Sequence, residues 1–226
     1  MPTRTLPLFP LNTVLFPGGL LPLQIFEPRY RQMIGECMEG DRLFGVCLIR
    51  RGEEVGEPAE PYDVGTTAEI LRLQPRGEGR YTLVAKGRDR FRIVTLHQGR
   101  PYLLAEIEYL PEPPPAEATG ARLPELRERL ETYIRTLAEL LGYEPGELVL
   151  PQDAAPLVYL ACSLMQLPLN EKQHLLELPD TDARLARVEL RLGRLLERAQ
   201  ELAERKRQGV ASPFNARAAL RRLPLN

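Results

Sequence analysis

The residues that nucleophilic hydrolysis requires are scarce in this chain. Its two serines are Ser163, within an apolar helical pattern, and Ser212, in a C-terminal segment before a proline. A catalytic serine needs a base or a desolvated lysine beside it, and the sequence around neither serine indicates one. The pattern G-x-x-x-x-G-K-[ST], whose backbone amides hold nucleotide phosphates, does not occur in the sequence. We therefore expect no peptidase or ATPase activity, and we predict that the protein is not an enzyme.

Candidate metal ligands are equally few. His97 and His174 are the two histidines and have no H-x-x-x-H spacing, and Cys37, Cys47 and Cys162 contain no C-x-x-C pair. A zinc site needs three or four converging ligands, so the sequence predicts neither a metal nor any other cofactor. Three cysteines without paired spacing also favour a reducing, cytoplasmic compartment over a disulfide framework.

One segment carries two carboxylates of the kind that glycosidases use in pairs. Glu106 and Glu108 share one face of an extended segment, and apolar Leu103, Ala105 and Ile107 occupy the other. Inward and outward alternation along a half-buried strand explains this pattern. We therefore interpret both glutamates as solvated side chains.

A second segment carries basic residues of equal parity, namely Lys86, Arg88, Arg90 and Arg92. On a regular strand they would form a basic stripe able to contact nucleic-acid phosphates. Phe91 has the opposite parity, so no aromatic side chain interleaves with the stripe for base stacking. Gly87 indicates a bulge that would break the parity. These two observations count against nucleic-acid binding, and an RNA-binding module is kept as the alternative function because of the basic residues.

An apolar reverse turn is the most specific local feature. Pro17 fixes φ and the two glycines after it permit positive φ, so the chain reverses there. Apolar side chains crowd this turn, where polar residues are usual; they are Leu15, Phe16, Leu20 and Leu21. We take them as the candidate polypeptide-binding surface and expect Phe16 to be at least partly exposed. The alternative is that the turn folds back and covers one end of its own domain.

The turn and the basic segment lie in a strand-rich half of the chain. Apolar or alternating runs predict strands at residues 43–49, 66–74, 80–86, 90–96 and 102–109. The spacing of apolar residues predicts a single helix at 27–39. Many short strands with one packed helix are typical of a small, partly open barrel.

A proline-rich connector separates this half from a helical one. The predicted parts are a β-rich domain, a linker, a helical bundle and a C-terminal tail, at residues 1–112, 113–121, 122–208 and 209–226. The last helix is predicted to be long and to begin at a cap provided by Asp180 or Thr181. The predicted fold class is α+β, a β-barrel domain followed by an all-α bundle.

The composition is that of an ordinary globular protein. The 226 residues are 43% hydrophobic and 27% charged, with a formal net charge of −1, so there is no overall attraction to nucleic acid or to anionic membranes. No apolar run approaches the roughly 20 residues of a membrane helix, and the N-terminus lacks the apolar core of a signal peptide. We expect a cytoplasmic protein without membrane contact.

Two stretches resemble one known family. The opening LPLFPL…VLFPG…LPLQIFEPRYRQM, at residues 6–33, resembles the start of the Lon N-terminal domain family. That family comprises the substrate-binding region of ATP-dependent Lon proteases, stand-alone bacterial relatives and the Lon-like domain of cereblon. The stretch LPLNEKQHLLELPDTDARLARVELRL, at residues 167–192, resembles the helical part of that region. The two stretches follow the family's order and spacing, and the resemblance covers roughly residues 5–207.

The resemblance implies a PUA-like β-domain followed by a helical bundle. It also implies a non-enzymatic, stand-alone bacterial protein that recognises substrates or acts as an adaptor, without the ATPase and protease domains of Lon. The implied partners are unfolded or apolar-rich polypeptides, together with a separate protease.

Overall fold

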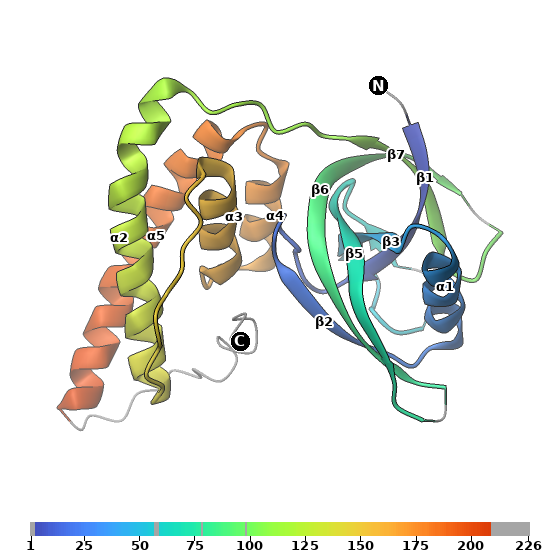
Figure 1. Ribbon diagram of the computed structural model, residues 1–226, viewed down its shortest axis with the longest axis horizontal. Helices are drawn as coiled ribbons and strands as arrows, with labels where there is room; N and C mark the ends of the chain where they lie inside the picture. Colours follow the sequence, from blue (N-terminus) through green and yellow to red (C-terminus); the bar gives the residue numbers. More distant parts are fainter. Residues whose placement is uncertain (1–2, 57–58, 78, 98, 209–226) are drawn as a thin grey trace. The chain divides into compact units, whose positions relative to one another are not determined.

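The computed structural model describes residues 3–56, 59–77, 79–97 and 99–208. The chain forms two compact units (Figure 1). The β unit comprises Met1–Pro111 and Pro168–Glu177, and the helical unit comprises Glu112–Leu167 and the chain from Leu178 onward. The chain therefore passes from one unit to the other three times.

Seven strands form the sheet of the β unit within the described residues. Their bounds are β1 Thr3–Leu11, β2 Leu20–Ile25, β3 Leu43–Arg51, β4 Glu60–Pro61, β5 Val64–Pro75, β6 Tyr81–His97 and β7 Leu103–Tyr109. β1 pairs antiparallel with β7 and parallel with β3, so the order β1-β7-β6-β5-β3 returns to β1. The predicted small barrel is confirmed, but it was predicted to be partly open, and the double pairing of β1 closes its ring.

Prolines within the strands occupy stretches that have a partner on one edge. Pro7 lies opposite Leu104 of β7, and Pro10 lies opposite Cys47 of β3. Pro22 lies on β2, which among the described residues pairs with β6 alone. Proline has no N–H to donate, so it is tolerated in strand stretches that pair along one edge only.

One helix packs against the barrel and shares its larger core. α1 (Pro28–Glu39) turns Tyr30, Met33 and Ile34 toward buried residues of β1, β3, β5 and β6. The rings of Phe9 and Tyr30 stack with their centroids 3.9 Å apart. Burial raises the pKa of Tyr30 to about 12, so its hydroxyl stays protonated at neutral pH. The predicted helix in the strand-rich half is confirmed.

The helical unit is built from α2 (Glu117–Leu141), α3 (Ala154–Leu164) and α5 (Thr181–Arg207). α2 ends at Gly142, whose φ of 76° is the left-handed conformation that glycine adopts without strain. The side chain of Asp180 accepts a 2.8 Å hydrogen bond from the amide of Ala183. The predicted cap and the long final helix are therefore confirmed.

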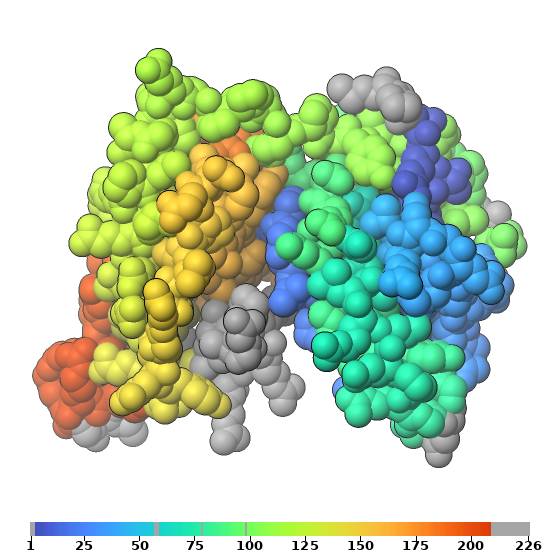
Figure 2. All heavy atoms as spheres, in the orientation of Figure 1, coloured from blue at the N-terminus to red at the C-terminus, as the bar shows by residue number. Residues whose placement is uncertain are grey.

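Two features of the helical half differ from a simple succession of helices. α2 begins at Glu117, inside the segment predicted as a linker, and α4 (Leu169–Glu177) belongs to the β unit. The connection between α2 and α3 runs over the surface of the helical unit (yellow in Figure 2), where Val149 is 86% exposed. No helix among the described residues is long and apolar enough to cross a membrane.

Candidate functional site

The apolar turn between β1 and β2 packs inward. Leu15 and Leu21 belong to the larger core cluster of the β unit, and Phe16 is only 1% exposed. The expectation that Phe16 is partly exposed is therefore wrong. Of the four apolar residues predicted around the turn, Leu20 is the accessible one, at 46%.

Backbone contacts hold this turn against β6. The amide of Gly18 donates to the carbonyl of Gly87 at 2.9 Å, and the amide of Gly87 donates to the carbonyl of Gly19 at 2.8 Å. A Cβ on Gly87 would lie 2.4 Å from the carbonyl oxygen of Phe16, so only glycine permits this approach. A glycine inside a strand is the sequence signal for such a contact. The bulge predicted from Gly87 is present directly after it, but the close contact with the turn was not predicted.

Leu20 lies beside apolar side chains of two neighbouring strands. The antiparallel register places Pro22 of β2 opposite Val84 of β6, and Val84 opposite Arg72 of β5. Leu71 is the extra residue where the register of β5 shifts, and it is 49% exposed. We call Leu20, Pro22, Leu71 and Val84 the outer-face patch.

The alternation of β6 puts this patch on the outside of the barrel. Leu83 and Ala85 are fully buried, so the side chains between and after them, Val84 and Lys86, point to the opposite face. Lys86 lies opposite both Leu20 of β2 and Glu69 of β5. The arrangement offers an apolar surface with charges at its border.

The predicted basic stripe does not form. The register of β5 and β6 shifts between Thr66 and Ala68, where β6 carries one extra residue. This bulge reverses the parity of the side chains beyond it, and Arg90 is only 3% exposed. Arg88 is exposed and forms an ion pair with Glu69. The expectation of one shared basic face is therefore wrong for Lys86, Arg88, Arg90 and Arg92.

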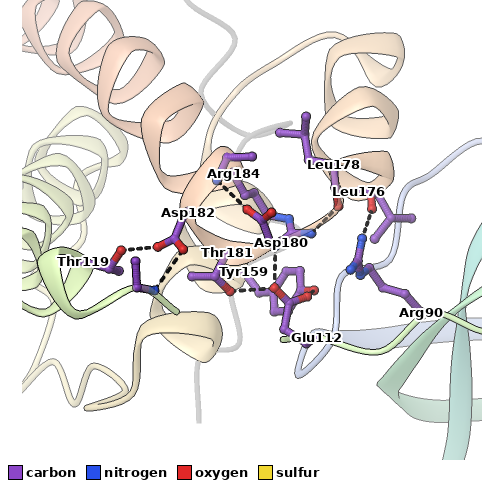
Figure 3. A network of polar contacts seen from close by, with 12 residues as sticks. Arg90, Glu112, Thr119, Tyr159, Leu176, Leu178, Asp180, Thr181, Asp182 and Arg184 are labelled. Carbon is purple, nitrogen blue, oxygen red and sulfur yellow. Dashed lines mark hydrogen bonds and ion pairs between the residues drawn. The ribbon is translucent and has the colours of Figure 1, made fainter. Parts of the chain in front are cut away.

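Arg90 instead helps to hold α4 on the barrel. Its Nη1 donates a 2.9 Å hydrogen bond to the carbonyl of Leu176 (Figure 3). Nε2 of Gln173, a side chain 1% exposed, donates a 2.9 Å hydrogen bond to the carbonyl of Val64 at the start of β5. These two buried side chains tie a helix from the second half of the chain to the barrel. Gln173, in the stretch at residues 167–192, is thus a residue that docks α4 on the barrel.

A separate polar network lies at the start of α5 in the helical unit (Figure 3). Glu112 accepts hydrogen bonds from Thr181 at 2.6 Å, from Arg184 at 3.1 Å and from the hydroxyl of Tyr159. The guanidinium of Arg184 is fully buried and lies 4.6 Å from the centroid of the Tyr159 ring. The network fixes the connector to the helical unit, because Glu112 directly follows the prolyl residue that ends the β unit's first segment.

The serine and cysteine side chains considered as catalytic or metal-binding groups are packed or hydrogen-bonded within the fold. The hydroxyl of Ser163 donates to the carbonyl of Tyr159 at 3.0 Å, one helical turn earlier. Burial raises the pKa of the Cys37 thiol to about 11 and that of the Cys47 thiol still higher, so both stay protonated at neutral pH. Across the described ranges, no three His, Cys, Asp or Glu side chains are grouped to hold a metal ion.

Comparison with solved structures identifies the same architecture elsewhere. A Lon N-terminal domain protein from Xanthomonas campestris superposes with a TM-score of 0.62 at 25% sequence identity, covering 83% of this chain and 98% of that chain. The N-terminal domain of a Mycobacterium avium complex Lon protease superposes with a TM-score of 0.64 at 18% identity, covering 84% and 98%. The second likeness concerns the fold alone.

Sequence comparison agrees with the fold. Lon protease 2 of Myxococcus xanthus is 35% identical over 191 residues, which are 82% of this chain and 23% of that protein. The Lon protease of Anaeromyxobacter dehalogenans is 33% identical over 189 residues, 81% and 22% of the two chains. The chain thus spans about a quarter of the length of these curated relatives. The family model described as the ATP-dependent protease La (LON) substrate-binding domain matches residues 5–193, and the chain belongs to this family.

Proposed function

We propose that this protein recognises polypeptides, as a substrate-binding or adaptor protein, through the outer-face patch of its β unit. The observation that carries the proposal is that Leu20 on β2 and Leu71 on β5 are both about half exposed and flank β6, where Val84 lies opposite Pro22. The family description, a substrate-binding domain, supports the same role. Aliphatic anchors that become desolvated on binding contribute most of the affinity at such surfaces.

The patch acts through its side chains and not through strand addition. Gly87 exchanges hydrogen bonds with Gly18 and Gly19, so the antiparallel alternation places the next exchanging pair at Leu21 and Ala85. Pro22 then faces the open edge of β2, where it has no N–H to offer. A polypeptide paired along this edge would lose one backbone hydrogen bond at the centre of the patch.

Apolar-rich, unfolded chains are the partners that this surface suits. An exposed aliphatic surface binds apolar side chains, which a folded partner buries in its own core and an unfolded chain leaves accessible. Lys86 and Arg72 lie at the border of the patch. They tolerate polar and acidic residues that stand between the apolar residues of the bound chain. We infer that the chain itself performs no peptide hydrolysis and passes its partners to a separate protease. Casein cleavage that disappears in Ser163→Ala would contradict this inference.

Binding of a fluorescently labelled, permanently unfolded protein, such as reduced and carboxymethylated lactalbumin, tests the patch. Leu20→Asp and Leu71→Asp should each weaken binding by about 1–2 kcal/mol, roughly five- to thirtyfold, with little change in melting temperature because both side chains are half exposed. Val94→Asp, at a residue of β6 that is 53% exposed and outside the patch, is the matched control. Equal affinities for the patch variants and the wild type would refute the proposal.

Phe16→Asp separates burial from binding. Phe16 is 1% exposed, so a charge at this position has to be desolvated and should lower the melting temperature strongly. Leu20→Asp should leave the melting temperature nearly unchanged. A stable Phe16→Asp variant that loses binding would mean that Phe16 itself contacts the polypeptide.

A further inference from the structure

A row of arginines follows one face of α5 in the helical unit. Arg187, Arg191, Arg194 and Arg198 are spaced i, i+4, i+7 and i+11, which at 100° per residue places them within an arc of about 60°. Arg187, Arg194 and Arg198 are exposed, and Arg191 is partly buried. We call these four residues the arginine stripe.

The stripe departs from the charge pattern of the helix packed beside it. On α2, the exposed arginines Arg129 and Arg135 each form an ion pair with a glutamate four residues earlier. On α5, the residue four positions after Arg187 is Arg191, and the residue four positions after Arg194 is Arg198. Like charges at this spacing destabilise a helix by about 0.2–0.5 kcal/mol per pair. Arg129 and Arg135 of α2 have no like charge four residues away, so the row of arginines on α5 departs from the pattern of α2.

The exposed guanidinium groups of Arg187, Arg194 and Arg198 are not used by the fold. α5 packs through other residues, among them Leu185, Val188 and Leu192, which are fully buried. Within the part of the chain that the structure describes, Arg187, Arg194 and Arg198 form no ion pair. Sites where a local rule is broken without a structural gain are candidates for function.

An exposed leucine lies within the stripe. Leu190 is 51% exposed and stands three residues after Arg187 and four before Arg194, so its side chain neighbours both guanidinium groups. A complementary partner carries carboxylates on both sides of an apolar side chain. We propose that the arginine stripe and Leu190 form a second docking surface, which binds an acidic polypeptide segment with an apolar residue at its centre.

A polypeptide fits this surface better than a nucleic acid. α5 contains no aromatic residue on which a base could stack. Glu197 and Glu201, both exposed, follow Arg194 and Arg198 by three residues and interrupt the basic surface, so it suits separate carboxylates better than an unbroken run of phosphates. Leu190 gives an aliphatic contact that phosphates and sugars do not use. Guanidinium groups bind carboxylates with paired, charge-assisted hydrogen bonds.

A labelled peptide with Glu residues flanking one central Leu tests the proposal by fluorescence anisotropy. Arg187→Gln/Arg194→Gln should weaken binding at least about tenfold, and Leu190→Ser should weaken it about threefold or more. The control Arg129→Gln/Arg135→Gln removes the same two charges from α2 and should change the affinity less than about twofold. Raising the salt concentration should weaken binding to the wild type and affect the α5 variant less.

Stability provides the second measurement. Neutralising Arg187 and Arg194 should leave the melting temperature unchanged or slightly higher, because like-charge repulsion is relieved. A clear fall would show that the stripe is structural and would overturn the proposal. Equal loss of peptide binding in both double variants would overturn it too, because attraction would then be general.

Two further outcomes concern the identity of the partner. A 20-nucleotide single-stranded RNA that binds more tightly than the peptide, and loses affinity in the α5 variant, would overturn the polypeptide assignment. Leu20→Asp should leave binding of the acidic peptide unchanged, so failure of the outer-face patch and failure of the stripe are distinguishable. Absence of peptide binding to the wild type would refute the stripe proposal alone.

Discussion

Gln173 and Val64 are 109 positions apart in the chain, and the side-chain amide of the first donates a 2.9 Å hydrogen bond to the main-chain carbonyl of the second. A second hydrogen bond runs from Arg90 of the barrel to the carbonyl of Leu176. One donor therefore lies on α4 and the other on the barrel, and both bonds hold α4 against the barrel. Each bond satisfies a main-chain carbonyl, one at the start of β5 and one in the last turn of α4. α4 therefore completes the β unit, although in the chain it follows α2 and α3 of the helical unit.

Replacing Gln173 should destabilise the β unit. Gln173→Ala leaves the buried carbonyl of Val64 without this donor, and an unsatisfied buried polar group costs about 1–3 kcal/mol. Gln32→Ala is the matched control: Gln173 and Gln32 each donate to a glutamate four residues later, Glu177 and Glu36, but Gln32 is on an exposed face of α1. Its cost should stay below about 0.5 kcal/mol. Urea denaturation followed by tyrosine fluorescence measures both, and equal midpoints would contradict the docking role of Gln173.

Two glycines should respond oppositely to alanine. Gly87→Ala places a Cβ 2.4 Å from the Phe16 carbonyl oxygen, so the turn has to move away from β6 and the melting temperature should fall. Gly193→Ala lies within α5 and has no atom within 4 Å of the new Cβ. It should stabilise the helix by about 0.5–1 kcal/mol, because alanine loses less backbone entropy than glycine. Scanning calorimetry distinguishes the two, and a neutral Gly87→Ala would show that the turn adapts easily.

Glu112 should be more important for stability than an exposed glutamate. Glu112→Gln leaves the buried guanidinium of Arg184 without its carboxylate, and breaking a buried ion pair costs about 3–5 kcal/mol. Glu139 pairs with Arg207 where both side chains are about half exposed, so solvent screens the pair and Glu139→Gln should lower stability far less than Glu112→Gln. Circular dichroism at the helix minimum during urea unfolding tests the comparison. A small effect of Glu112→Gln would mean that Thr181 and Tyr159 hold Arg184 in place without the charge.

Acid should loosen the contact between α1 and the segment before β7. The Tyr102 hydroxyl donates a 2.5 Å hydrogen bond to Glu36, and this bond, with help from Gln32 and Arg100, lowers the pKa of Glu36 below its ordinary 4.5. A carboxyl with a lowered pKa in the folded state stabilises the protein above the unfolded pKa, and this stability is lost as the pH falls through the folded pKa.

Tyr102→Phe removes the largest cause of that lowered pKa. The unfolding midpoint of the variant should therefore decline less steeply than that of the wild type between about pH 5 and pH 3. Tyr143→Phe, at a residue 60% exposed, should retain the wild-type slope. Parallel pH profiles for Tyr102→Phe and the wild type would exclude this linkage.

The sequence by itself determined the elements that local rules govern. Alternation and turn residues specify the strands, because side chains of a half-buried strand must alternate between core and solvent. The i, i+3, i+4 spacing specifies α1, and an aspartate cap specifies the start of α5. The resemblance at residues 6–33 and 167–192 also pointed to the family that the comparisons show. These features depend on neighbours within a few residues, which the sequence displays directly.

Exposure at the candidate site was decided only by tertiary structure. Phe16 and Leu20 are both apolar and flank the same turn, yet one is 1% and the other 46% exposed. The difference arises because the turn is hydrogen-bonded to Gly87 on a distant strand, which lets the turn pack inward. Gly87 predicts a bulge on β6, yet only the register and α4 show that Arg90 is the buried arginine and Arg88 the exposed one. Which unit contains α4 depends on Gln173 reaching Val64 across 109 residues. Long-range pairing sets these outcomes, and no local pattern encodes the register in which two distant strands meet.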